Sequence, residues 1–194
     1  AGAVNTLVFT GGEIFGDNTD GAGLVRDITV NLRRSLAGQR ILLLGAGGAA
    51  RGVIAPLLAA QPASLLIANR SADKAAALAK SFLDIAATTE TTVGPRVNAG
   101  NFAETADKSF DIVINATSAS LSGESLPLPS GIFAAGSLAY DMMYGRGDTP
   151  FMVLARQQGA AHCADGLGML VEQAAEAFFI WRGVRPETTA VLAE

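Results

Sequence analysis

One segment predicts the fold of this chain most clearly: Arg40-Ile41-Leu42-Leu43-Leu44-Gly45-Ala46-Gly47-Gly48-Ala49-Ala50-Arg51-Gly52. Ile41 to Leu44 is a continuous apolar run of strand length, and it ends at a glycine cluster that opens an Ala/Leu-rich helical stretch. Gly45, Gly47 and Ala50 occupy the three positions of the dinucleotide-binding pattern G-x-G-x-x-G/A. The segment therefore predicts a strand, a tight turn and a helix whose first amides hold a pyrophosphate.

The end of the next predicted strand, Ser64 to Ala68, indicates which dinucleotide binds. It is followed by Asn69-Arg70-Ser71, with Lys74 one helical turn further on. An NAD site has an Asp or Glu here, which accepts hydrogen bonds from the ribose 2′-hydroxyl. A carboxylate would repel a 2′-phosphate, whereas Arg70 can bind it as a planar fork and Lys74 as a point charge. The sequence favours NADP; a structural alternative is that Ser71 only caps the next helix while both cations lie in solvent.

Composition limits the class of protein. With 194 residues, 49% of them hydrophobic and 16% charged, the chain suits one large domain with a sizeable core. The net charge of −4 argues against a nucleic-acid partner, which would need a basic face. No apolar run reaches the roughly 18 residues of a membrane span, so we expect no membrane partner.

Cysteine and histidine are scarce. One of each leaves no intrachain disulfide and no zinc cluster, so we expect no metal, and this usage fits a reducing cytoplasm. The first residues, from Ala1, lack the basic and apolar regions of a signal peptide. The absence of a starting Met suggests a piece of a longer protein.

The amino-terminal region predicts a hairpin followed by a helix. Gly11-Gly12 separates two short apolar segments, which is a hairpin signal. A polar stretch, residues 16–21, then leads into an amphipathic helix predicted over Ala22 to Leu36. Asp20 lies at its start, where a carboxylate favours the helix dipole, and capping alone would explain that acid.

Strands and helices alternate along the rest of the chain. We predict further strands at Arg96–Ala99, Phe110–Ser118, Ser137–Met143 and Ala160–Ala164, helices at Ala72–Leu83, Phe151–Gln158 and Met169–Arg182, a connection at Ile85–Gly94, a loop at Ser120–Ser130 and a terminal helix or frayed tail at Pro186–Glu194. Such alternation predicts an α/β fold, a Rossmann-like doubly wound parallel sheet with helices on both faces. Ligands bind at the carboxyl ends of such strands, where Ala116, Thr117 and Ser118 fall.

Eight short motifs occur in order along nearly the whole chain. They are Ala3-Val4-Asn5-Thr6, Gly16-Asp17-Asn18-Thr19-Asp20-Gly21, Gly45-Ala46-Gly47-Gly48-Ala49, Asn69-Arg70-Ser71, Asn115-Ala116-Thr117-Ser118, Tyr140-Asp141-Met142-Met143-Tyr144, Thr149-Pro150-Phe151 and Asp165-Gly166-Leu167-Gly168-Met169-Leu170-Val171-Glu172-Gln173-Ala174. Together they resemble the carboxyl-terminal NADP domain of the shikimate dehydrogenase family.

The resemblance implies reversible NADPH-dependent reduction of 3-dehydroshikimate to shikimate, in aromatic amino-acid biosynthesis. It implies that Asp20 pairs with a catalytic Lys, and that Asn5, Asp20, Tyr144 and Gln173 form the substrate site. The implied cofactor residues are Gly45, Ala46, Gly47, Gly48, Ala49, Asn69, Arg70, Ser71, Ala116, Thr117, Ser118, Met142 and Gly166, to which the charge argument above adds Lys74. For Met142, simple packing in the core is the open alternative.

The family's amino-terminal substrate domain, with its Ser-x-Ser motif and catalytic Lys, has no counterpart here. The only lysines are Lys74, Lys80 and Lys108, and none lies in a matching motif. We therefore expect residues 1–20 to be the end of a substrate domain, residues 21–182 an NADP-binding Rossmann domain, and residues 183–194 a tail or helix returning toward the substrate domain. Alone, the chain should bind NADP with little or no turnover.

Two other functions stay open on the sequence. A free-standing NADP-binding or sensing module would explain the missing lysine, although it would not need Asn5, Asp20 and Gln173. A quinate/shikimate relative that uses NAD is disfavoured by Asn69-Arg70 in place of an acid.

Overall fold

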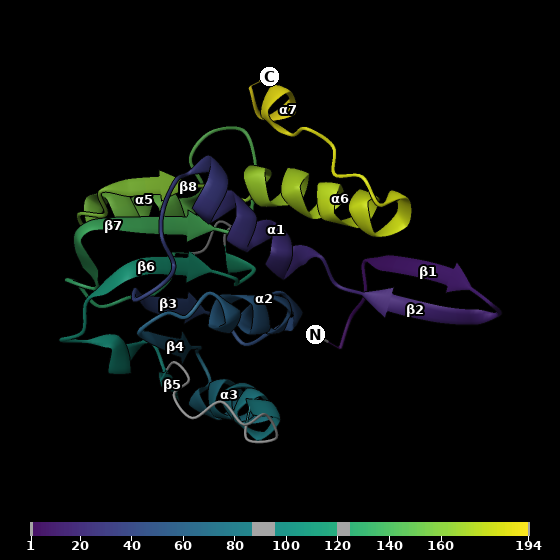
Figure 1. Ribbon diagram of the computed structural model, residues 1–194. Helices are drawn as coiled ribbons and strands as arrows, with labels where there is room; N and C mark the ends of the chain where they lie inside the picture. The colour runs from purple at the N-terminus through teal and green to yellow at the C-terminus, as the bar shows by residue number, and fades with distance from the viewer. Residues whose placement is uncertain (1, 87–95, 120–124, 194) are drawn as a thin grey trace.

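A six-stranded parallel sheet forms the centre of the protein, and a separate two-stranded hairpin projects from it (Figure 1). The computed structural model describes residues 2–86, 96–119 and 125–193. Within these residues the strands are β1 (Thr6–Thr10), β2 (Glu13–Asp17), β3 (Arg40–Leu44), β4 (Ser64–Ala68), β5 (Arg96–Gly100), β6 (Phe110–Asn115), β7 (Phe133–Asp141) and β8 (His162–Ala164).

The large sheet has the strand order β5-β4-β3-β6-β7-β8, and every neighbouring pair is parallel. Counted from β3, this is the order 3-2-1-4-5-6 of a dinucleotide-binding sheet, in which the chain reverses direction between the first and fourth strands. The glycine turn after β3 lies at that switch point. The α/β, Rossmann-like prediction is thus confirmed.

Helices cover both faces of this sheet. The helices and helical turns of the described residues are α1 (Asp20–Arg26) with the π-helical turn η1 (Asp27–Asn31), α2 (Gly48–Ala59), α3 (Ala72–Ala86), the 3₁₀ turn η2 (Ala103–Thr105), α5 (Pro150–Gln157), α6 (Leu167–Arg182) and α7 (Thr189–Leu192). Ile41 and Leu43 face a core formed with α1, α2, α3 and α6, whereas Leu42 and Leu44 face a second core that includes α5. Each fully buried aliphatic side chain contributes about 1.5–3 kcal/mol, so this alternation is the main stabilising pattern.

The helix expected over Ala22–Leu36 differs from the prediction at both ends. It begins at Asp20, becomes a π-helical turn at Asp27 and ends near Arg33, whose φ of +53° is incompatible with a continuing helix. Gly23 allows α1 to lie close to α6, because a Cβ at this position would be only 2.7 Å from the amide nitrogen of Gln173 in α6. The structure therefore has a short helix packed closely on α6, and the long amphipathic helix that periodicity predicted is not formed.

Other boundaries move by a few residues. β6 ends at Asn115 and β7 at Asp141, before the predicted Ser118 and Met143, because both side chains bind the backbone of the following turn. β7 also starts earlier, at Phe133, and β8 is shorter than predicted. α3 continues to Ala86; residues 87–94 of the predicted connection and 120–124 of the predicted loop lie outside the described residues.

The predicted hairpin is present, with β1 and β2 antiparallel and Gly11 and Gly12 both at positive φ. Trp181 of α6 ties it to the main body, since its indole nitrogen donates to the carbonyl oxygen of Leu7 at 2.9 Å. Among the described residues, none of the helices is both long and apolar enough for a membrane crossing. That same part of the chain holds no group of three or more metal-binding side chains.

Candidate active site

The turn between β3 and α2 is built for close backbone approach. Gly45 has φ +109°, and a Cβ there would lie 3.0 Å from the carbonyl oxygen of Ala116 in the turn after β6. Gly47 and Gly48 face open space, because a Cβ at either would meet nothing within 4 Å. The first amides of α2 have no partner within their own helix. The turn is therefore a cradle with free backbone donors at a positive helix end.

A cavity of about 870 Å³ extends from this cradle along the carboxyl edge of the sheet. That volume suits a cofactor and a small substrate together. Its lining includes sixteen of the eighteen residues expected from the sequence: Asn5, Asp20, Gly45, Ala46, Gly47, Gly48, Ala49, Asn69, Arg70, Ala116, Thr117, Ser118, Met142, Tyr144, Gly166 and Gln173. Ser71 and Lys74 are not among the lining residues. One cavity thus brings together residues from both ends of the chain.

Arg70 lies at one end of this cavity, just beyond β4. Its side chain is exposed, and Asn69 holds the turn through a 3.2 Å hydrogen bond from its side-chain nitrogen to the carbonyl oxygen of Ser71. Lys74 is exposed on α3 outside the lining. Arg70 is therefore the cation of the predicted pair that the structure places at the cavity.

The opposite end holds a cluster of polar side chains from three elements. Asn5, just before β1, donates from Nδ2 to a carboxylate oxygen of Asp20 at 2.9 Å and lies 3.3 Å from Oε1 of Gln173 in α6. The hydroxyl of Thr19 lies 3.1 Å from the side-chain oxygens of both Asn5 and Gln173. Because Thr19 is buried, its hydroxyl holds the Asn5 and Gln173 side chains in place from the protein interior. The structure therefore brings Asn5, Asp20 and Gln173 together.

Asp20 faces Asn5 instead of capping its own helix. The backbone N–H of Asp20 donates to the side-chain oxygen of Asn18 at 3.1 Å, so Asn18 supplies an acceptor for one amide of the first turn. The Asp20 carboxylate is left facing the cavity. Capping by Asp20, the simpler interpretation of the sequence, does not account for this geometry.

The wall between the two ends comes from β6, β7 and the turn before α6. Gly166 donates its N–H to the carbonyl oxygen of Met143 at 3.0 Å and packs directly against Met142. Met142 is partly buried, contacting the core on one side and lining the cavity on the other. Tyr144 is half-exposed at the mouth. Residues that line the cavity but were not expected from the sequence are Phe102, Ala119, Ser125, Leu126, Pro127, Met143, Met169 and Leu170.

Two buried polar residues hold this wall in place, and sequence reasoning missed their role. Asn115 accepts from the hydroxyl of Thr117 at 2.7 Å and donates to Asp141 at 3.0 Å. Asp141 also accepts from the hydroxyl of Thr149 at 2.6 Å. This chain of bonds joins the turns after β6 and β7. A signal was available, because polar residues that end apolar strands need buried partners.

These features define a dinucleotide-binding domain of the Rossmann class, with a cluster of polar side chains at the other end of its cavity. A family model described as Shikimate / quinate 5-dehydrogenase matches residues 27–122, and one described as Shikimate 5'-dehydrogenase C-terminal domain matches residues 166–194. The chain belongs to the shikimate dehydrogenase family, as the following relatives show.

A curated shikimate dehydrogenase (NADP(+)) from Dechloromonas aromatica is 76% identical over all 194 residues, which span 68% of its length. Among solved structures, an Ael1 enzyme from Pseudomonas putida has TM-score 0.88 and 51% identity over 98% of this chain and 67% of that one. The shikimate 5-dehydrogenase of Thermus thermophilus, in complex with NADP(H) and shikimate, has TM-score 0.75 and 31% identity over 96% and 64%. The chain spans about two thirds of the length of these relatives.

Proposed function

We propose that this chain is the cofactor-binding part of an NADP-dependent shikimate dehydrogenase, which reduces 3-dehydroshikimate reversibly to shikimate in aromatic amino-acid biosynthesis. One observation carries the proposal. A single cavity joins a glycine cradle and Arg70 at one end to the Asn5, Asp20 and Gln173 cluster at the other. A reaction between a dinucleotide and a polyhydroxylated substrate needs both ends in one space.

The residues present fit NADP. Gly47 and Gly48 leave room where side chains would block a pyrophosphate, and the α2 amides would hold its charge. Arg70 would bind the 2′-phosphate in a planar fork, and Lys74 would add charge nearby. Met142 and Gly166 would contact the nicotinamide, with Ala116, Thr117 and Ser118 along the groove. The bound cofactor supplies the hydride.

The polar cluster would bind and orient the substrate. Asn5, Gln173 and Tyr144 carry groups that hydrogen-bond hydroxyls, and Thr19 keeps two of these in place. The Asp20 carboxylate would hold an ammonium group beside the substrate carbonyl. Its charge would shift the pKa of that ammonium group and so tune it for proton transfer. Lys74, Lys80 and Lys108 are the chain's lysines, and none is a described lining residue. We propose that the partner lysine comes from an amino-terminal substrate domain.

The hairpin supports this proposed partner. Phe9 and Ile14 are 70% and 65% exposed on a two-stranded sheet, an arrangement that is marginal without further strands. Residues 1–20 would complete the substrate domain and residues 21–182 would form the NADP domain. Residues 183–193 double back along α6 and include α7, so the tail as it lies here leads away from the hairpin (Figure 1).

The test compares binding with turnover. The chain alone should bind NADP more tightly than NAD in calorimetry and show little or no dehydroshikimate reduction. Fusing it to the amino-terminal third of the Dechloromonas relative should restore turnover. Failure to bind NADP would overturn the cofactor assignment, and near-normal turnover by the chain alone would overturn the need for a partner lysine. A fusion that binds NADP but stays inactive would favour an NADP-binding or sensing module.

A further inference from the structure

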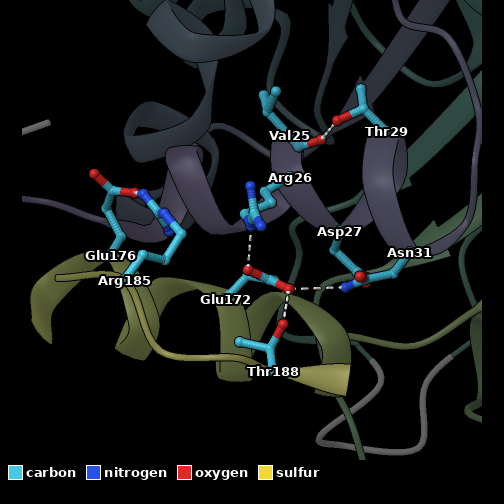
Figure 2. Close-up of polar contacts among 9 residues, drawn as sticks. All are labelled: Val25, Arg26, Asp27, Thr29, Asn31, Glu172, Glu176, Arg185 and Thr188. Atoms are coloured by element: carbon cyan, nitrogen blue, oxygen red, sulfur yellow. Dashed lines mark hydrogen bonds and ion pairs between the residues drawn. The ribbon is translucent and has the colours of Figure 1, made fainter. Parts of the chain in front are cut away.

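A buried charge lies behind the polar cluster. Glu172 of α6 is 0% exposed and accepts hydrogen bonds at both carboxylate oxygens (Figure 2). Arg26 donates from Nε at 2.7 Å to one oxygen; Asn31 donates from its amide at 3.1 Å and Thr188 from its hydroxyl at 2.7 Å to the other. The donors come from the end of α1, from η1 and from the tail after α6. One side chain therefore joins three segments.

Position along the helices links this charge to the cavity. Glu172 directly precedes Gln173, whose side-chain oxygen lies in the polar cluster. Arg26 is the last residue of α1, and Asp20 is the first. The 2.7 Å ion pair between Arg26 and Glu172 thus holds the last residue of α1 beside Gln173 in α6. Asp20, the first residue of α1, belongs to the same polar cluster as Gln173.

Close packing between these helices makes the position of Gln173 depend on how α6 is rotated against α1. Gly23 leaves α1 almost in backbone contact with α6, because a Cβ would lie 2.7 Å from the Met169 carbonyl oxygen and from the Gln173 amide. Gly23 has no side chain that would separate the α1 and α6 backbones. A roll of α6 about its axis would therefore carry Gln173 away from Asn5 and Thr19.

We propose that Glu172 is a positioning residue for the substrate end of the cavity: through Arg26 it sets the rotation of α6 on α1, so that Gln173 and Asp20 converge on Asn5. Glu172 is not a lining residue and touches no reacting group. The positioning rests on geometry alone, and its effect on substrate rests on the proposed function.

The chain supplies a matched control. Glu176 lies one turn further along α6 and forms an ion pair with Arg185 (Figure 2), and neither is among the described residues that line the cavity. Glu172→Gln and Glu176→Gln therefore remove the same charge, in the same shape, from the same helix. Arg26→Lys weakens the Glu172 pair from its other side, because a lysine cannot reproduce the Nε contact.

The readout is the side-chain amide resonances of Asn5 and Gln173 in ¹H–¹⁵N spectra of the whole 194-residue chain. Glu172→Gln and Arg26→Lys should move both resonances in the same direction, while Glu176→Gln leaves them in place. NADP affinity should stay within about twofold in all three, since Arg70 lies at the other end. A general loss of stability would move NADP affinity as well.

Two outcomes would overturn the positioning role. One is unchanged Asn5 and Gln173 resonances in Glu172→Gln despite a lowered melting temperature. The other is an equal movement of these resonances in Glu176→Gln. If Glu172→Gln does not fold, the milder Arg26→Lys decides by the same comparison. Shifted resonances in a chain that does not bind NADP would support the positioning role and overturn only the proposed function.

Discussion

The hydroxyl of Tyr140 donates a 2.6 Å hydrogen bond to the carboxylate of Asp27, and both residues lie in the core. Burial raises the pKa of the Asp27 carboxyl above its ordinary value, while hydrogen bonds from Tyr140 and Asn31 oppose the rise and the nearby charge of Glu172 adds to it. Burial also raises the pKa of the Tyr140 hydroxyl, and the adjacent Asp27 carboxylate raises it further. The pair joins η1 to β7, under the wall of the cavity.

Asp27 should make the protein less stable as the pH rises. Because its pKa is higher in the folded state than in the unfolded chain, the fold binds more protons than the unfolded chain between the two values. The free energy of unfolding should therefore fall as pH rises from the ordinary Asp value through the raised one. Asp27→Asn should remove this slope, and urea unfolding from about pH 4 to about pH 8 would measure it.

Tyr140→Phe tests the same pair from its other side. It removes a donor to the ionised carboxyl, so the pKa of Asp27 should rise further and the fall in stability should steepen. We expect a loss of about 1–3 kcal/mol at neutral pH. If the free energy of unfolding of wild type and of Asp27→Asn changes in parallel across the pH range, both expected pH dependences are wrong.

Arg70→Ala should separate the two nicotinamide cofactors. Loss of a charged hydrogen-bonding group costs about 1.5–3 kcal/mol, so NADP should bind roughly ten- to a hundredfold more weakly while NAD changes little. Calorimetric titration with each dinucleotide would measure this. Lys80→Ala, which removes an exposed charge from α3, is the control. An equal loss for NAD and NADP would show that Arg70 does not read the 2′-phosphate.

Gly45→Ala and Gly47→Ala should fail for different reasons. At Gly45 the backbone has φ +109° and a Cβ would crowd Ala116, so we expect a loss of stability of about 1–3 kcal/mol. At Gly47 a Cβ meets nothing, so the stability loss should stay below about 1 kcal/mol while NADP affinity drops. Thermal unfolding with and without NADP distinguishes them. Wild-type NADP affinity in Gly47→Ala would argue against a pyrophosphate at this turn.

Asp20→Asn should affect chemistry and leave cofactor binding intact. An asparagine oxygen can still accept the 2.9 Å bond from Asn5, so the cluster keeps its shape and loses only a charge. In the fusion with the substrate domain, turnover should fall on the order of 10²- to 10⁴-fold. NADP affinity should not change. Asp73→Asn on the exposed face of α3 is the control, and a similar loss of turnover in that variant would refute a specific role for Asp20.

Short-range patterns predicted most of this fold. The apolar run at residues 41–44, the glycines after it and the hairpin turn at Gly11-Gly12 each depend on neighbours in sequence, and each has the predicted structure. The helix after Asp20 was predicted less well. Its periodicity at Leu24, Ile28, Leu32 and Leu36 continues past the π-helical turn, since Leu36 is buried without being helical. Burial and helicity are separate properties, and periodicity reports only the first.

The sequence by itself determined the sheet class, the glycine turn and the choice of Arg70 over an acid, because those features are encoded within single contiguous segments. Only the tertiary structure decided which polar residues share one cavity and what holds them there. Thr19 joins Asn5 to Gln173, and Arg26 meets Glu172 across 146 residues of sequence. Such contacts follow from the crossing of α1 and α6, and no local pattern encodes the distance between two helices that pack through a glycine.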